Sequence, residues 1–263
     1  MKTRILLLAG LLGLAASAQA ALVAKTVDYT ADGQTMKGYL VYDNAYHGKR
    51  PGVLVVHEWW GLNSYARGRA RMLAKEGYTA LALDMYGDGK TAGHPKTAEA
   101  FMNAVNNNMP VEKARFMAAY DLLTAQPTVK KDDVAAIGYC FGGGVVLNMA
   151  RLGAPLKSVV SFHGMLMSDL KTEPGSIKPK ILVFTGGADQ FVPAKEVAAF
   201  EQEMKTAKAD FRVVVYPGAE HSFTNPGATA LGKKFNLPLK YDRAADKDSW
   251  AQTTVFLKQT LGD

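Results

Sequence analysis

The chain has 263 residues, of which 48% are hydrophobic and 21% charged, and its formal net charge is +7 at pH 7. No linker, repeat or low-complexity tract divides it, so we expect one α/β domain, and its scattered lysines without a recognition motif argue against nucleic-acid binding. The single cysteine excludes an internal disulfide.

Residues 1–20 have the pattern of a secretory signal peptide. A basic start with Lys2 and Arg4 precedes a short apolar stretch, and an Ala-x-Ala sequence ends at Ala20. The apolar stretch is too short to anchor the chain comfortably in a bilayer. We therefore expect cleavage after Ala20 and a periplasmic or secreted domain of residues 21–263 that does not associate with a membrane.

The rest of the chain alternates between strand and helix patterns. Residues 25–44 alternate apolar and polar positions around Ala31-Asp32-Gly33, which predicts an antiparallel hairpin. Continuous apolar runs then predict strands that are buried on both faces; these are 52–56, 79–83, 134–138, 157–162, 180–185 and 211–216. Helical spacing predicts the helices 65–76, 97–106, 111–126, 143–151, 194–207 and 246–260. This order predicts a mostly parallel, doubly wound sheet with the hairpin at an antiparallel edge.

The most informative segment joins the strand 134–138 to the helix 143–151. It reads Gly138-Tyr139-Cys140-Phe141-Gly142-Gly143, the layout of a sharp turn that presents a nucleophile above a sheet. Gly138 and Gly142 would let neighbouring segments approach without a Cβ clash. A lone cysteine is usually a small buried hydrophobe. Glycines on both sides, at a junction between strand and helix, favour a nucleophile instead.

Active sites of such sheets lie beyond the carboxyl ends of the strands. Asp189 follows the strand 180–185, and His221 follows the strand 211–216. A thiol nucleophile needs a base, and the base needs an orienting carboxylate. Taken alone, Asp189 is also interpretable as a turn or capping residue and His221 as an ordinary loop histidine. The histidines have no metal-ligand spacing, so we expect no metal and no other cofactor.

The chain resembles the dienelactone hydrolase family, which are α/β-hydrolases with a cysteine nucleophile. The matching segments follow the family's order and span nearly the whole mature chain. They are His57-Glu58-Trp59-Trp60-Gly61, Asp84-Met85-Tyr86, Gly138-Tyr139-Cys140-Phe141-Gly142-Gly143, Gly187-Ala188-Asp189-Gln190-Phe191-Val192-Pro193 and His221-Ser222-Phe223. The resemblance implies an α/β-hydrolase fold and hydrolysis of small esters or lactones.

The resemblance also implies roles for the matching residues. Cys140 would attack the carbonyl and form a thioester, His221 would act as base and acid, and Asp189 would orient His221. Glu58 matches a glutamate that pairs with the resting nucleophile and helps substrate binding to activate it. From its own sequence context, Glu58 is equally interpretable as a polar loop residue.

The surroundings of the nucleophile complete the expected site. The backbone N–H groups of Trp59 and Phe141 would form the oxyanion hole. Aromatic residues at strand ends suggest a pocket for a compact, weakly charged acyl group, although such residues also pack in cores; they are Trp59, Trp60, Tyr86, Tyr139 and Phe223.

The chain departs from the family at two positions. Family members that open dienelactone hold its carboxylate with two arginines, where this chain has Asp88 and Asn225. Without those cations the anion clamp is lost, so we expect a different ester or lactone. Arg69 lies in a helix with other arginines, a pattern typical of a solvated face.

Two alternatives remain open at this level. The same triad would serve an acyltransferase or a peptidase. A binding or thiol redox-sensing protein on a hydrolase scaffold would also retain the cysteine and histidine. We expect a small-molecule ester or lactone as the only partner, without nucleic acid or membrane, and a monomer or small homo-oligomer.

Overall fold

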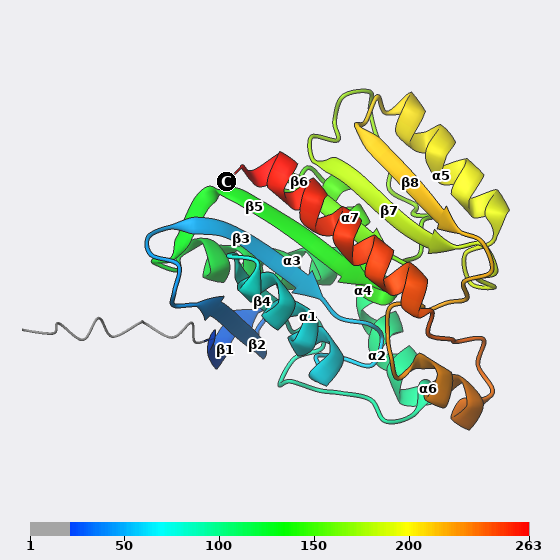
Figure 1. Cartoon of the computed structure of the whole chain (residues 1–263), viewed down its shortest axis with the longest axis horizontal. Helices are drawn as coiled ribbons and strands as arrows, with labels where there is room; N and C mark the ends of the chain where they lie inside the picture. Colours follow the sequence, from blue (N-terminus) through cyan, green and yellow to red (C-terminus); the bar gives the residue numbers. More distant parts are fainter. Residues whose placement is uncertain (1–21, 263) are drawn as a thin grey trace, which may run out of the picture.

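The structure is a computed structural model and describes residues 22–262. The predicted signal peptide, residues 1–20, lies outside the described residues. Eight strands form one sheet in the order β1-β2-β4-β3-β5-β6-β7-β8 (Figure 1). The strands are β1 (Leu22–Ala31), β2 (Gln34–Asp43), β3 (Arg50–Val56), β4 (Thr79–Leu83), β5 (Val129–Tyr139), β6 (Ser158–Phe162), β7 (Lys180–Gly186) and β8 (Phe211–Tyr216). The helices are α1 (Ser64–Lys75), α2 (Pro95–Asn106), α3 (Met109–Thr124), α4 (Phe141–Arg151), α5 (Ala194–Thr206), α6 (Ala228–Phe235) and α7 (Arg243–Leu261).

The predicted hairpin is confirmed as β1 and β2. They pair antiparallel from Leu22 opposite Asp43 to Ala31 opposite Gln34. The two turn residues, Asp32 and Gly33, both have positive φ, at 42° and 76°, as a tight hairpin turn that matches the strand twist requires. Strand β2 then pairs antiparallel with β4, whereas the pairs from β4 through β3 to β8 are all parallel.

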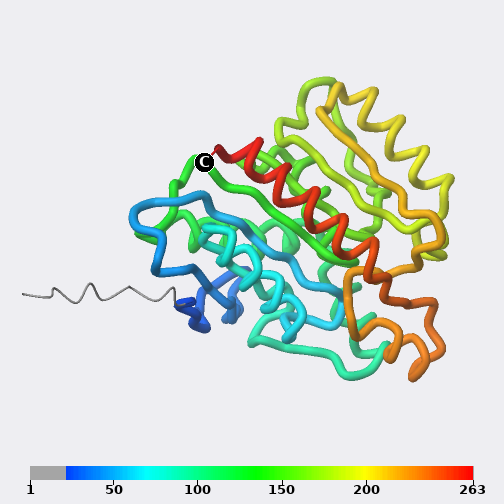
Figure 2. The backbone as a smooth tube through the Cα atoms, in the orientation of Figure 1, coloured from blue at the N-terminus to red at the C-terminus, as the bar shows by residue number. Residues whose placement is uncertain are grey.

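Helices cover both faces of the sheet. On one face, α1 and α7 pack on alternate strand residues such as Val55, Ile137 and Leu182. On the other face, α3, α4 and α5 pack on residues such as Leu54 and Ala136. Figures 1 and 2 show α7 crossing the sheet near α1. Because each central strand is apolar on both sides, both of its faces need a helical cover, and the predicted doubly wound α/β fold is confirmed.

One helix was not predicted from the sequence. Helix α6 lies in the connection between β8 and α7, where we expected a loop (Figure 1). It is short, and Gly232 sits inside it with its Cα against the backbone of Leu239, so a Cβ at that position would lie 2.4 Å from the Leu239 oxygen. A central glycine weakens helix propensity, and tertiary packing makes this helix form. Among residues 22–262, no helix has the length and apolar character needed to cross a membrane.

Candidate active site

The turn at Cys140 has the strained geometry that its sequence predicts. Cys140 lies between the end of β5 and the start of α4, with φ 53° and ψ −116°. A Cβ on Gly138 would lie 2.0 Å from the Gly142 oxygen, and one on Gly142 would lie 2.4 Å from the Val56 oxygen. Only glycine fits both positions. The surrounding packing therefore holds the cysteine in a backbone conformation that non-glycine residues rarely adopt.

His221 and Asp189 meet beside this turn. The Nδ1 atom of His221 lies 2.8 Å from Oδ2 of Asp189, and both residues are buried. The other carboxylate oxygen, Oδ1, accepts hydrogen bonds from the backbone N–H groups of Phe191 at 2.8 Å and Val192 at 3.2 Å. These two bonds fix the plane of the carboxylate. Asp189 is therefore both the turn residue that its sequence context suggested and the partner of His221.

The electrostatic surroundings of His221 favour its charged form. Burial lowers the pKa of His221, but its electrostatic interaction with Cys140 and its hydrogen bonds with Asp189 and Cys140 outweigh that effect. Together they raise the pKa of His221 to about 10. The structure therefore brings Cys140, His221 and Asp189 together as one interacting group. His221 interacts with both of the others, as a base must with a nucleophile and an orienting acid.

Glu58 is buried behind the site and paired with Asn225. Its exposed fraction is 1%, and Oε2 accepts a 2.6 Å hydrogen bond from Nδ2 of Asn225. The other oxygen, Oε1, has no hydrogen-bond partner among the described residues. Burial raises the pKa of Glu58, and the hydrogen bond from Asn225 opposes that rise. Asn225 thus acts as a neutral donor to the Glu58 carboxylate.

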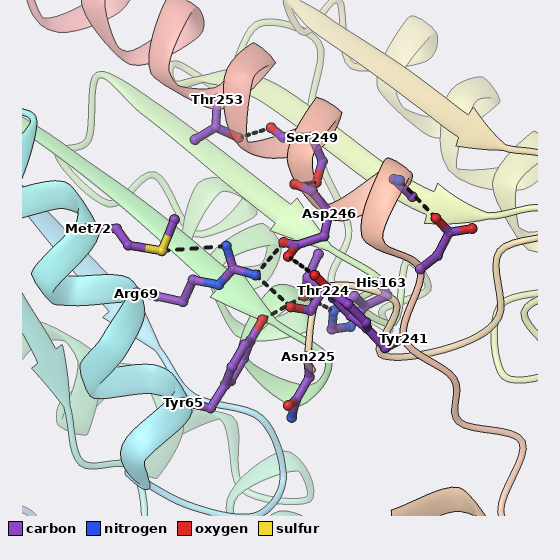
Figure 3. Close-up of polar contacts among 12 residues, drawn as sticks. Tyr65, Arg69, Met72, His163, Thr224, Asn225, Tyr241, Asp246, Ser249 and Thr253 are labelled. Atoms are coloured by element: carbon purple, nitrogen blue, oxygen red, sulfur yellow. Dashed lines mark hydrogen bonds and ion pairs between the residues drawn. The ribbon is translucent and has the colours of Figure 1, made fainter. Parts of the chain in front are cut away.

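A second polar cluster holds the loop that carries His221 (Figure 3). His163 Nε2 lies 2.7 Å from the hydroxyl of Thr224, and the hydroxyl of Tyr65 lies 2.6 Å from the same oxygen. The Thr224 carbonyl accepts a 2.6 Å hydrogen bond from Arg69, which also pairs with Asp246. The ring of His163 meets that of His221 edge to face, with centroids 5.2 Å apart.

This cluster contains residues that sequence reasoning missed or misplaced. Arg69 was expected on a solvated face, but it is buried, because α1 turns this side chain toward α7 and the loop after β8. Thr224 had no sequence signal beyond lying close to His221. His163 follows the end of β6, and the rule that active sites lie at strand ends does point to it, but that rule alone gave it no role.

The sulfur and the imidazole open onto a narrow apolar cavity of about 270 Å³. Besides Cys140 and His221, its walls are mainly apolar side chains: Trp59, Met102, Phe141, Met165, Phe191 and Leu239. The predicted oxyanion donors border this cavity, and the backbone N–H groups of Trp59 and Phe141 donate no hydrogen bond to another described residue. An oxyanion beside the sulfur would therefore find two free N–H donors in an apolar setting.

Four of the predicted pocket aromatics do not line this cavity. Trp60, Tyr86, Tyr139 and Phe223 are all buried in hydrophobic clusters, because aromatic side chains at strand ends gain most by packing against helices and neighbouring rings. Tyr86 still supports the site, since its hydroxyl donates a 3.0 Å hydrogen bond to the Trp59 carbonyl. The lining residues Met102 and Leu239 lie far from any strand end and carried no sequence signal.

Within residues 22–262, no three histidine, cysteine, aspartate or glutamate side chains gather in an arrangement that could hold a metal ion.

Known proteins are similar to this chain over most of its length. The family model described as the dienelactone hydrolase family matches residues 36–261. Protein usf of Aquifex pyrophilus is 30% identical over 240 residues, which cover 89% of this chain and 98% of that protein. A putative carboxymethylenebutenolidase of Escherichia coli K12 is 27% identical, covering 92% of this chain and 89% of the relative.

A solved structure is also similar over most of the chain. It is described as a dienelactone hydrolase-like promiscuous phosphotriesterase from metagenomic libraries, and it superposes with a TM-score of 0.87 at 37% identity. The match covers 92% of this chain and all of that one. A putative dienelactone hydrolase of Klebsiella pneumoniae, at 24% identity and a TM-score of 0.75, shares the fold.

Proposed function

The chain belongs to the dienelactone hydrolase family and is a hydrolase of that type, and we propose that it cleaves small carboxylic esters or lactones through a thioester on Cys140. One observation carries the proposal. The only sulfhydryl in the chain stands on a strained turn beside His221, which is hydrogen-bonded to Asp189, and both Cys140 and His221 line the apolar cavity.

The first half-reaction forms the acyl-enzyme. The Cys140 thiolate adds to the ester carbonyl, and the carbonyl π electrons move to the oxygen, which the N–H groups of Trp59 and Phe141 stabilise. Loss of one such donor in a comparable enzyme costs about 2.7–4 kcal/mol of barrier. The tetrahedral adduct collapses, the bond to the alcohol oxygen breaks, and the proton held on His221 passes to the departing alkoxide. The product on Cys140 is a thioester.

The second half-reaction returns the enzyme to its starting state. A water molecule gives a proton to neutral His221 and adds to the thioester carbonyl. The new tetrahedral adduct expels the Cys140 thiolate and releases the carboxylic acid. Asp189 keeps the Nδ1 proton of His221 in place throughout, so that Nε2 exchanges protons with the reacting groups.

The buried pair of Glu58 and Asn225 bears on the choice of substrate. In place of a family arginine, Asn225 presents a neutral amide that is already engaged with Glu58. No net positive charge is available at that position to bind a substrate carboxylate. We therefore infer that uncharged esters and lactones are preferred over dienelactone, which is an anion.

Alkylation offers a direct test, because iodoacetamide has a single sulfhydryl to modify in this chain. Intact mass follows the extent of carbamidomethylation while hydrolysis of p-nitrophenyl acetate and a simple lactone is measured on the same samples. We expect activity to fall in proportion to modification of Cys140. In the Cys140→Ser variant, alkylation disappears and turnover drops by at least ~100-fold. Equal turnover in wild type, Cys140→Ala and His221→Ala would overturn the proposal.

The same samples separate hydrolysis from the alternatives. A redox-sensing scaffold would react with peroxide at Cys140 but show no turnover of any ester. An acyltransferase would release p-nitrophenol faster when a primary alcohol or amine is added, with the acyl group recovered on that acceptor. Hydrolysis as proposed yields the free acid at the same rate in the presence and absence of the acceptor.

A second substrate class is suggested by the similar solved structure described as a promiscuous phosphotriesterase. The Cys140 thiolate would form an S–P bond as the P–O bond to the leaving alkoxide or aryloxide breaks, with the proton of His221 passing to that leaving oxygen and the same two N–H groups donating to the phosphoryl oxygen. We propose phosphotriesters as secondary substrates. A mass increase of one dialkylphosphoryl group on Cys140, absent in Cys140→Ser, is the expected observation, and no adduct and no turnover would contradict it.

We also propose that the enzyme acts outside the cytoplasm after cleavage following Ala20, since residues 1–20 have the pattern of a signal peptide. N-terminal sequencing of the chain from its native cell fraction tests this, with Ala21 expected as the first residue. The working form, a monomer or small homo-oligomer, is measurable by light scattering on the same material.

A further inference from the structure

A second, wider cavity adjoins the apolar one. Its volume is about 590 Å³, and it shares the side chains of Asn106, Phe141 and Met165 with the cavity at Cys140. The two compartments are therefore neighbours that share part of their lining, and a ligand that spanned both would reach from the sulfur into the wider one. The proposed thioester reaction itself uses only the narrow compartment.

The chemistry of the two compartments differs. The narrow one is lined mainly by apolar side chains. The wider one carries three side-chain amides, a hydroxyl and a carboxylate: Asn106, Asn107, Asn148, Ser168 and Asp169. Among the described residues that line the wider compartment, Asp169 is the sole charged one. A substrate that fits both would be apolar at one end and hydrogen-bonding at the other.

The polar side chains of the wider compartment differ in whether they already form hydrogen bonds within the protein. Asn148 is held in place, because its Nδ2 donates a 3.0 Å hydrogen bond to Oε1 of buried Glu112. Asn106 and Asn107 stand at the end of α2, and their side chains make no hydrogen bond with another described residue. Each of these two amides leaves both a donor and an acceptor for a ligand.

The rim of the two compartments is apolar and exposed. Six large hydrophobic side chains are exposed within residues 22–262, and three of them, Met165, Met167 and Phe191, line one compartment or the other. Such a concentration of exposed apolar side chains is typical of a binding site. Flat methionine and phenylalanine surfaces next to amides suit a ligand with C–H faces and hydroxyl edges.

We propose that the wider compartment binds the hydroxylated half of the substrate, so that the enzyme hydrolyses esters that join a compact apolar group to a neutral sugar-like polyol. This inference rests on the proposed function. Amides give and accept hydrogen bonds from hydroxyl groups, and the Asp169 carboxylate accepts them. The same carboxylate repels anions, and no lining cation attracts them. Hydrolysis consumes one water and releases the polyol and the acid.

The test compares acetate esters of similar size and different polarity. The set consists of methyl 6-O-acetyl-glucoside, its apolar counterpart cyclohexylmethyl acetate, a 6-carboxylated sugar acetate and the cationic ester acetylcholine. We expect kcat/KM for the neutral sugar ester to exceed that for the cyclohexyl ester by at least about tenfold, because several hydrogen bonds are gained. The anionic ester should be the poorest substrate. Equal values for the sugar and cyclohexyl esters, or a preference for either charged ester, would overturn the inference.

Variants then locate the preference in the wider compartment. Asn107→Leu should lower the sugar-to-cyclohexyl ratio of kcat/KM by about threefold to tenfold, the effect of one or two hydrogen bonds. Asp169→Lys should raise kcat/KM for the anionic ester relative to the neutral one by about threefold to tenfold. The control is Asn103→Leu, the same change at an exposed position of α2 that lines neither cavity, which should leave every ratio unchanged. Unchanged ratios in Asn107→Leu and Asp169→Lys would refute the assignment.

Failure of this inference is distinguishable from failure of the proposed function. If the wild type turns over p-nitrophenyl acetate with acylation of Cys140 but shows no preference for the sugar ester, only the inference is contradicted. If the wild type shows neither turnover nor acylation of Cys140, the proposed function is contradicted.

Discussion

Asn225 and Glu58 form a buried hydrogen bond of 2.6 Å that joins the loop after β8 to the loop after β3. The amide donates from Nδ2, while its Oδ1 accepts from the backbone N–H of Gly227 at 2.9 Å. Both sides of the Asn225 amide are therefore used. The pair ties the loop that carries His221 to the loop of one predicted oxyanion donor, Trp59.

Replacing the Asn225 amide, which donates to Glu58, with a carboxylate should make the free energy of unfolding depend on pH. Asn225→Asp retains the oxygen that Gly227 binds, but it places a second carboxylate against Glu58. When two carboxylates lie this close together, they share a proton. The pKa of the pair therefore rises above the values in the unfolded chain, and the free energy of unfolding falls as pH rises through and above about 5. We expect a loss of roughly 2–4 kcal/mol at pH 8 and much less at pH 4.5, measured by urea unfolding.

A reversed pair provides the control for this prediction. Combining Glu58→Gln with Asn225→Asp restores one donor and one acceptor, so much of the stability lost at pH 8 should return. A double variant as unstable as Asn225→Asp alone would show that the pairing is not the cause.

Asp189→Asn tests the orientation of His221. Asparagine keeps the Oδ1 acceptor for Phe191 and Val192, but it replaces the oxygen that faces His221 with an amide. The wrong imidazole tautomer is then favoured, and the pKa of His221 falls because one of the interactions that raise it is lost. We expect kcat for p-nitrophenyl acetate to drop by about 10²–10⁴-fold.

The matched control for that variant is Asp210→Asn, an exposed aspartate beside Lys180. It should leave kcat unchanged. Retention of more than half of the wild-type kcat by Asp189→Asn would rule out an orienting role.

Thr224→Val tests the clamp behind His221. Valine has nearly the same shape but lacks the hydroxyl that meets His163 and Tyr65. Because buried His163 and half-buried Tyr65 would both be left unpaired, we expect the free energy of unfolding to fall by about 1–3 kcal/mol. A shifted imidazole should also lower kcat by about tenfold or more, with a smaller effect on KM.

Thr206→Val, at the exposed end of α5, is the control and should change neither quantity. A Thr224→Val enzyme that is less stable but has the wild-type kcat would mean that the cluster supports the fold without positioning His221.

Glu112 provides a pH-dependent contribution to stability. Burial raises its pKa to about 7, and the hydrogen bond from Asn148 opposes that rise. A carboxyl group whose pKa is higher in the folded state stabilises the fold least at high pH, so its cost grows from the unfolded pKa near 4.5 up to about 7. Glu112→Gln keeps an acceptor for Asn148 and cannot ionise. The variant should be more stable than wild type by roughly 1–3 kcal/mol at pH 8 and equal to it at pH 4.

Denaturant unfolding at both pH values measures this difference, with the exposed Glu99→Gln as the control. A stability difference that does not change between pH 4 and pH 8 would show that Glu112 is not the titrating group.

Much of the sheet was predictable because its signals are local. The strands 79–83 and 211–216 have the predicted bounds, and the turn at Asp32-Gly33 lies where the hairpin pattern placed it. Helices differ mainly at their starts; α2, for example, begins at Pro95 because His94 caps it. Helix α6 was missed because its propensity is low and its packing partner, Leu239, lies beyond its own end.

By itself, the amino-acid sequence determined where the proposed reacting residues lie along the chain, because strand ends, glycine turns and the order of Cys140, Asp189 and His221 are written in short segments. Only the tertiary structure decided which side chains surround them. Arg69 turned inward, four aromatics entered the core, and Met102, Leu239 and the amides of the wider cavity came together from separate helices and loops. The physical reason is that burial and cavity shape depend on how helices pack across the sheet, and this packing joins residues that are distant in sequence.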